Sequence, residues 1–216
     1  MIYSLLKRSG RMNKIRQVAL DLIINDACEL FLSRSVNDVT IADIAAKSEV
    51  GVATVYRYFS TKKNILEKCA MKLQAKVYRE YFTLSGKTGY EKIKKFYYGY
   101  LEVFKNHPEF YRFINEFDAF MTVEKVEGGD TLEEYSKGLD LFREEYEKTY
   151  LEGCFDGSIK KVDDINAFYY ATTHAILELS KKLSANVCIV RQDEEIKKED
   201  EIRILVEIIL STLKNQ

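Results

Sequence analysis

The segment from Thr40 to Leu66 constrains the fold of this chain more than any other part of the sequence. It reads TIADIAAKSEVGVATVYRYFSTKKNIL and contains two short helical patterns around a turn of four to six residues. Thr40 is a suitable N-cap for the first pattern, and Asp43 stands three residues later, as in a variant of the capping box. Ala45 supplies a small residue where the two helices cross. This arrangement predicts a helix-turn-helix.

Helical periodicity extends along most of the chain, which has one proline, Pro108, and ten glycines among 216 residues. So few breakers favour long helices and short connections. Apolar spacing and turn residues predict nine helices, with residues 185–199 left ambiguous. The predicted helices span residues 13–33, 41–47, 52–59, 62–84, 90–106, 108–121, 132–151, 163–184 and 200–213. The fold class is therefore all-α.

The pattern further predicts two domains. A three-helix, N-terminal helix-turn-helix domain spans residues 1–61, and a larger C-terminal helical bundle spans residues 62–216. Residues 1–11 precede Met12 and are expected to be an upstream extension or a flexible basic arm. Charge follows the same division: residues 1–63 hold 10 Lys/Arg and 6 Asp/Glu (net +4), and residues 64–216 hold 23 and 28 (net −5). A cationic excess on the first domain is compatible with nucleic acid.

Composition argues against several other classes of protein. The four cysteines lie far apart without a CxxC pair, and there are two histidines, so neither a zinc site nor a disulfide framework is expected. Free thiols fit a reducing cytoplasm. No apolar run reaches the ~18–20 residues of a membrane span. Neither a set of nucleophile, base and acid nor a phosphate-binding loop is present, so we expect no enzyme, metal or cofactor.

The second helix of the motif presents an outward face with the chemistry of a major-groove reader. Thr54 can hydrogen-bond a base or a phosphate, and Arg57 can bind guanine or phosphate. Val52 and Ala53 are small or apolar and can touch thymine methyl groups. Tyr56, Tyr58, Thr40 and Lys62 are expected to hold phosphates, which fixes register without reading sequence. Two amphipathic helices in an ordinary α-bundle remain the alternative. Glu49 stands in the turn where a left-handed backbone often favours glycine.

These residues resemble the DNA-binding domain of the tetracycline-repressor (TetR/AcrR) family of bacterial regulators. The resemblance covers about 55 residues without a gap. It rests on Thr40-Ile41, Ile44-Ala45, Val50, Thr54-Val55-Tyr56, Tyr58-Phe59, Lys62 and Leu66. It implies a cytoplasmic homodimer that binds a palindromic operator in double-stranded DNA as a transcriptional repressor. It also implies release by a small effector bound in the C-terminal domain.

The C-terminal domain is rich in aromatic residues, which the resemblance implies would in part line a pocket for an apolar or aromatic effector. Packing in an ordinary core is the alternative for each of them. The candidates for the pocket are Tyr97, Phe104, Phe113, Phe117, Phe120, Met121, Tyr146 and His174.

Two apolar-striped helices end the chain, and they form either half of an intermolecular four-helix bundle or part of the chain's own core. The resemblance favours the dimer. The candidate interface residues are Phe168, Thr172, Ile176, Leu179, Leu205 and Ile209. A DNA-bound structural or adaptor protein that lacks a small-molecule ligand is the alternative function.

Overall fold

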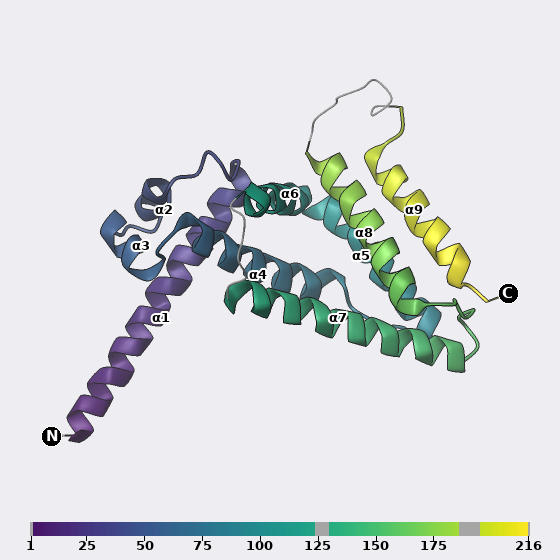
Figure 1. The fold of residues 1–216 in the computed structure, drawn as a ribbon, viewed down its shortest axis with the longest axis horizontal. Coiled ribbons are helices and arrows are strands. Elements are labelled where there is room, and N and C mark those ends of the chain that lie inside the picture. Colours follow the sequence, from purple (N-terminus) through teal and green to yellow (C-terminus); the bar gives the residue numbers. More distant parts are fainter. Residues whose placement is uncertain (1, 124–129, 186–194, 216) are drawn as a thin grey trace. The chain divides into compact units, whose positions relative to one another are not determined.

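The computed structural model describes residues 2–123, 130–185 and 195–215, and side-chain surroundings for all of these except residues 2–15, 130–132 and 134–135. The described residues form nine helices (Figure 1), so the all-α prediction is confirmed. The chain divides into two compact units, Met1–Lys72 and Leu73–Gln216. This division falls inside helix α4 (Lys62–Tyr81), whereas the sequence pattern predicts a boundary at its start, between residues 61 and 62.

The first unit contains α1 (Ile2–Ser33), α2 (Ile41–Lys47), α3 (Val52–Tyr58) and the first half of α4. Its core draws apolar side chains from all four helices and from the loop after α1. Stable packing of two seven-residue helices requires this shared core, because helices so short are marginal in isolation. The buried residues include Ile23, Ala27, Phe31, Val36, Val39, Ile44, Val55, Phe59, Ile65, Leu66 and Cys69.

The N-terminal helix is longer than predicted. It begins at Ile2 and runs without a break to Ser33, so residues 2–11 continue the helix that the pattern starts at residue 13. Leucine, lysine and arginine in this stretch are good helix formers. Adding turns to an existing helix also avoids the cost of a new nucleus.

The second unit contains the rest of α4 with α5 (Gly89–Asn106), α6 (Pro108–Val123), α7 (Asp130–Phe155), α8 (Ile165–Ser184) and α9 (Lys198–Leu213). Helix α5 is central and packs against α7, α8 and α9. Helices α8 and α9 lie side by side as an antiparallel pair (Figure 1). An isolated antiparallel bridge joins Ile159 to Lys214 and ties the end of the chain to the loop after α7.

Most helix boundaries agree with the sequence pattern because local signals set them. Thr88 caps α5 and Asp164 caps α8, each by accepting a backbone N–H three residues later. Helix α7 extends beyond the predicted residues 132–151 at both ends, and it finishes only at Phe155 before the left-handed Gly157 (φ 78°). A left-handed glycine is a common helix stop. The ambiguous stretch of residues 185–199 lies largely outside the described residues.

Candidate functional site

The turn between α2 and α3 has the geometry of a tight helix-turn-helix. Ser48 closes α2, and the Val50 N–H donates to the Ala45 carbonyl at 3.0 Å. Between them Glu49 adopts φ 53°, the left-handed conformation that disfavours side chains with a Cβ. The sequence pattern therefore identified the strained position, and the chain accepts glutamate there. Gly51 then serves as N-cap of α3 with ordinary extended backbone.

The start of α2 is fixed by a reciprocal capping box. The Asp43 N–H donates to the Thr40 hydroxyl at 3.1 Å, and the Thr40 N–H donates to the Asp43 carboxylate at 2.7 Å. The Thr40 hydroxyl also donates to this carboxylate at 2.7 Å. These bonds from the backbone and hydroxyl of Thr40 lower the pKa of Asp43, with a smaller contribution from Arg34. The predicted capping box is confirmed, and the structure shows that the polar groups of Thr40 are used within α2.

Helix α3 separates its side chains into a buried and an outward face. Val55 is fully buried, and Phe59 is buried directly after the helix. Val52, Ala53 and Arg57 are exposed, Tyr56 is 52% exposed, and Thr54 and Tyr58 are half-buried. The outward face therefore carries small side chains at the start of the helix and a cation near its end. Such a face can approach a groove closely before the longer side chains reach base edges.

Arg57 is free to act on a ligand. Its guanidinium lies 5.1 Å from the centre of the Tyr58 ring, a distance at which a cation and an aromatic face attract each other. Among the described residues, Arg57 forms no ion pair with a carboxylate. The fork of N–H donors is thus available for a bidentate acceptor such as guanine or phosphate.

Lys62 is held more tightly than its predicted role requires. Its ammonium donates to the Val36 carbonyl at 2.5 Å and is half-buried. Burial lowers the pKa of Lys62, and the nearby Asp38 and Asp43 carboxylates oppose that effect. One of the three N–H groups of the ammonium is therefore used within the unit, and two remain for a phosphate.

The second unit contains a cavity of about 250 Å³ between α4, α5, α7 and α8. Aromatic and polar side chains line it together. The lining residues are Gln74, Tyr78, Tyr100, Ser136, Leu139, Asp140, Arg143, Tyr169, Tyr170, Thr173, His174 and Leu177.

Of the eight residues predicted for a ligand pocket, the structure places His174 on this cavity. Phe120 and Met121 are half-buried on α6 and do not line it. The other five are buried in the core, where Phe113 stacks on Phe117 and Tyr97 hydrogen-bonds Tyr146. These five are Tyr97, Phe104, Phe113, Phe117 and Tyr146. The sequence pattern shows which residues are aromatic but not which sides of four helices meet around a space.

The predicted interface residues divide in a similar way. Ile176 and Ile209 are buried in the chain's own core, since they lie on the sides of α8 and α9 that pack within the unit. Phe168, Thr172, Leu179 and Leu205 are half-buried. The apolar side chains that α9 leaves outward are instead Ile204 and Ile208, the latter 57% exposed.

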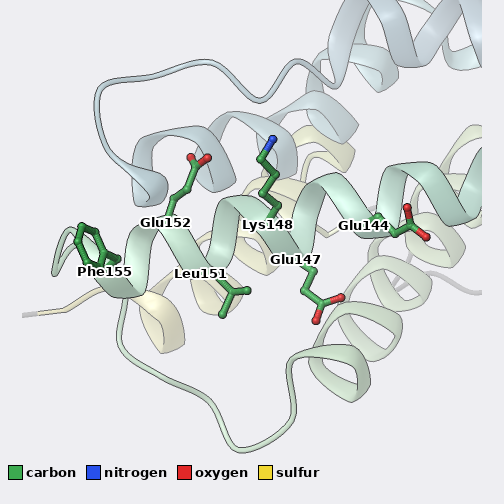
Figure 2. Close-up of a pocket in the computed structure, with 6 residues that line it drawn as sticks. All are labelled: Glu144, Glu147, Lys148, Leu151, Glu152 and Phe155. Atoms are coloured by element: carbon green, nitrogen blue, oxygen red, sulfur yellow. The ribbon is translucent and has the colours of Figure 1, made fainter.

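A second hollow, of about 540 Å³, lies along α7 (Figure 2). Its lining comes from one helix alone: Glu144, Glu147, Lys148, Leu151, Glu152 and Phe155. One of these, Glu152, already forms an ion pair with Lys92 at 2.6 Å. Because no other helix of the described ranges contributes to its lining, this hollow is a surface feature of α7 and lacks the walls of a binding site.

The cysteines form no metal or disulfide site among the residues with described surroundings. Cys28 and Cys69 are buried in the first unit, Cys154 is half-buried, and Cys188 lies outside the described residues. Within the described ranges, no three His, Cys, Asp or Glu side chains are grouped as metal ligands. No helix in the described part of the chain has the length and apolar character needed to cross a membrane.

The sequence of the first unit matches a known family. Residues 23–69 match the model of the family described as "Bacterial regulatory proteins, tetR family". The match covers the end of α1, all of α2 and α3, and the start of α4, which are the elements that build the face described above. No curated protein matches the sequence of this chain.

Solved structures share the fold of the whole chain at low sequence identity. The ketosteroid transcriptional regulator KstR2 of Mycobacterium tuberculosis has a TM-score of 0.61 at 12% identity, over 90% of this chain and 94% of that one. A transcriptional regulator from Cytophaga hutchinsonii has a TM-score of 0.62 at 17% identity, over 91% and 98%. A proposed transcriptional regulator from Saccharomonospora viridis, in complex with choline, has a TM-score of 0.63 at 17% identity, over 93% and 100%.

Proposed function

Because residues 23–69 match the model of the tetR family of bacterial regulatory proteins, we propose that this chain is a transcriptional repressor of that family whose helix α3 reads operator DNA. The outward face of α3 carries the proposal. It follows a tight turn and combines small residues at its start with an exposed Arg57 that forms no ion pair in the described part of the chain.

The residues of this face take two roles in the proposal. Thr54 and Arg57 read base edges, and Val52 and Ala53 contact thymine methyl groups. Tyr56, Tyr58 and Lys62 hold phosphates and set the register. Thr40 belongs to this second group through its position at the start of α2, since its hydroxyl and N–H already bind Asp43.

The regulator acts as a homodimer in this proposal. A two-fold pair of α3 helices matches a palindromic operator with half-sites about 34–36 Å apart. The outward Ile204 and Ile208 of α9 supply an apolar strip for an intermolecular bundle, and the half-buried Leu179 and Leu205 are further candidates for this interface. Ile176 and Ile209 support this bundle from inside the protomer.

Effector control is the third part of the proposal. The cavity of the second unit is walled by four helices and holds a small molecule, which acts in the cytoplasm by favouring a dimer with weaker affinity for the operator. The tyrosine walls of this cavity suit an effector with an apolar or aromatic part. The similar fold from Saccharomonospora viridis was solved with choline, a small ligand of matching scale. A structural or adaptor protein would not need such a space.

Fluorescence anisotropy with the full chain and genomic fragments beside its own gene tests the proposal. We expect sequence-selective binding that weakens steeply as salt rises, because each phosphate contact releases counterions. A scrambled fragment of equal length is the control. Equal affinity for both fragments would overturn sequence-specific regulation, and no binding to either would overturn the DNA-binding role.

A further inference from the structure

The cavity of the second unit is bordered by a run of aromatic rings. The ring centres of Tyr169 and Tyr170 are 5.5 Å apart, and those of Tyr170 and His174 are 5.8 Å apart. Tyr78 and Tyr100 complete the wall from α4 and α5. Several aromatic faces around one small space attract a cation through their negative π-faces.

Charged groups at the cavity also favour a cation. Asp140 is exposed on the lining and forms no ion pair among the described residues. The guanidinium of Arg143 is occupied, since it donates to Glu147 at 3.1 Å and to Asn166 at 3.0 Å. Helix α7 as a whole carries eight acidic and three basic residues, a net of −5. A carboxylate that forms no ion pair among the described residues therefore lines the cavity, whereas the one guanidinium of the lining is paired with Glu147.

Two phenol hydroxyls of the lining, those of Tyr100 and Tyr169, have no hydrogen-bond partner among the described residues. Tyr100 is 6% exposed, lines the cavity, and its hydroxyl forms no hydrogen bond with any described residue. The Tyr169 hydroxyl likewise has no partner in the described part of the chain. Burial raises the pKa of both phenols, and Tyr78 adds to the effect, so both stay neutral in water at ordinary pH. Neither hydroxyl oxygen belongs to the fully buried, unpartnered atoms of the described residues, so both stay open to the cavity and can hydrogen-bond a polar ligand group.

The size of the cavity limits the ligand. Its volume of about 250 Å³ lies below the range of about 300–1,000 Å³ that holds drug-sized molecules. An ammonium group with a few carbon atoms fits this space, but a steroid or a multi-ring compound does not fit without enlarging it.

We propose that this cavity binds a small organic ammonium cation, with the head group among Tyr78, Tyr169 and Tyr170 and Asp140 as its counter-charge. The free Tyr100 hydroxyl then hydrogen-bonds a polar group elsewhere on the ligand. The role of this ligand as effector rests on the proposed function. Binding of the ligand to the cavity does not depend on DNA.

Three probes of similar shape and different charge test the ligand class by isothermal titration calorimetry on the full chain. They are tetramethylammonium, neutral tert-butanol and anionic pivalate. We expect tetramethylammonium to bind about 10-fold or more tightly than either of the others, as cation–π attraction and one carboxylate predict. Equal binding of all three, preference for pivalate, or no heat from tetramethylammonium would overturn the proposal.

Paired variants locate the binding. Asp140→Asn keeps the shape of the side chain and removes its charge, and it should weaken tetramethylammonium binding roughly 3- to 10-fold, because exposed charges interact modestly. Glu145→Gln removes an exposed charge from the same helix, but Glu145 does not line the cavity. The affinity of this variant for tetramethylammonium should therefore equal that of the unchanged chain. Equal losses in both variants would show a general effect of helix charge and overturn the role of Asp140.

DNA binding provides a separate readout of the regulatory proposal. If tetramethylammonium binds but no genomic fragment does, the cation site stands and the repressor function fails. If operator binding is salt-sensitive and selective but the three probes bind alike, the repressor function stands and the cation site fails. Addition of tetramethylammonium to the protein–operator complex should lower operator affinity, and an unchanged affinity would remove the effector role from this site.

Discussion

Gly89 of α5 and Gly153 of α7 approach so closely that a Cβ on Gly89 would lie 2.3 Å from the Gly153 Cα. Ile159 packs against the other side of Gly153, so neither backbone can retreat freely. The crossing is reinforced by the Gly89 N–H, which donates to the Asp156 carboxylate at 2.8 Å. The central helix of the second unit is therefore seated on α7 through backbone contact.

Gly89→Ala should destabilise the second unit because its methyl group meets backbone atoms that cannot rotate away. Overpacking of this kind costs about 1–3 kcal/mol, sometimes more. Gly138→Ala in α7 is the matched control, since a Cβ there meets nothing within 4 Å. In a helix interior it should stabilise by roughly 0.5–1 kcal/mol. Urea unfolding followed by circular dichroism measures both, and similar effects of the two changes would contradict the close crossing.

Tyr97 joins two partners in the core of the second unit. Its hydroxyl lies 3.0 Å from the Tyr146 hydroxyl and 2.6 Å from the Thr172 hydroxyl. Burial raises the pKa of Tyr97 to about 12, with the two hydrogen bonds opposing the shift. Tyr97 is thus a bridging core residue, which explains why it is absent from the cavity lining.

Tyr97→Phe should destabilise the protein more than Tyr146→Phe. The first change breaks both contacts and leaves the buried Tyr146 hydroxyl without a described partner, which costs about 1–3 kcal/mol. The second change breaks one contact and leaves Tyr97 bonded to Thr172. Free energies of unfolding from urea titrations give the comparison. Equal losses, or a larger loss for Tyr146→Phe, would show that Tyr97 does not act as the bridge.

Local and distant features differ in how well the sequence predicts them. The capping box of Thr40 and Asp43 lies within four residues, so its pattern is legible in the sequence and α2 has the predicted bounds. The cavity brings Tyr78 next to Asp140 and Tyr170, from three helices far apart in the chain. No local pattern reports which helix sides meet there, and aromatic content alone indicated core residues such as Phe113.

The same distinction applies to the helical faces. Periodicity identified the apolar stripes of α8 and α9 but could not tell a side that packs within the chain from one left outward. Ile209 and Ile208 are neighbours in sequence, yet the first is buried and the second exposed. The difference arises from the direction in which α9 docks on α5, which depends on contacts across the whole unit.

Glu49→Gly should stabilise the helix-turn-helix because Glu49 has φ 53°. A left-handed conformation costs a residue with a Cβ about 1–2 kcal/mol, and part of that gain is lost to the greater entropy of glycine in the unfolded chain. Glu49→Ala is the control, since it removes the carboxylate and keeps the strain. Thermal unfolding should rank glycine above alanine by up to about 1 kcal/mol. Identical melting of the two variants would indicate that the carboxylate, not the backbone, sets stability here.

Asp43 should make the stability of the first unit depend on acid pH. Hydrogen bonds from Thr40 lower the pKa of Asp43 in the folded chain, below the value of about 3.9 in an unfolded one. The stabilisation is therefore complete above the unfolded pKa and is lost as pH falls through the folded pKa. Asp43→Asn removes this titration, so the stability gap between the two proteins should narrow below pH ~4.

Urea titrations between pH 2 and pH 7 measure that gap. Thr40→Ser serves as control because it keeps the hydroxyl and the backbone N–H that bind Asp43. It should retain the pH dependence of the unchanged chain. A gap that stays constant across the whole range would mean that the Asp43 carboxylate gains nothing from the capping box.

Variants of the α3 face should separate residues that read sequence from residues that hold phosphate. Arg57→Lys keeps the charge but loses the bidentate fork, so it should relax sequence preference by about 1–3 kcal/mol at one base pair. Lys62→Ala should weaken binding to all fragments alike and reduce the salt slope by about 1.

Two controls accompany these variants. Because the Lys62 ammonium also binds the Val36 carbonyl, the melting temperature of Lys62→Ala must be compared with that of the unchanged chain before affinities are interpreted. Lys160→Ala, an exposed cation of the second unit, should change neither preference nor slope. If Arg57→Lys and Lys62→Ala both lower the affinity for all fragments uniformly, Arg57 is a phosphate contact. Thr54 is then the remaining candidate for reading a base, and Thr54→Ala in the same assay tests that role.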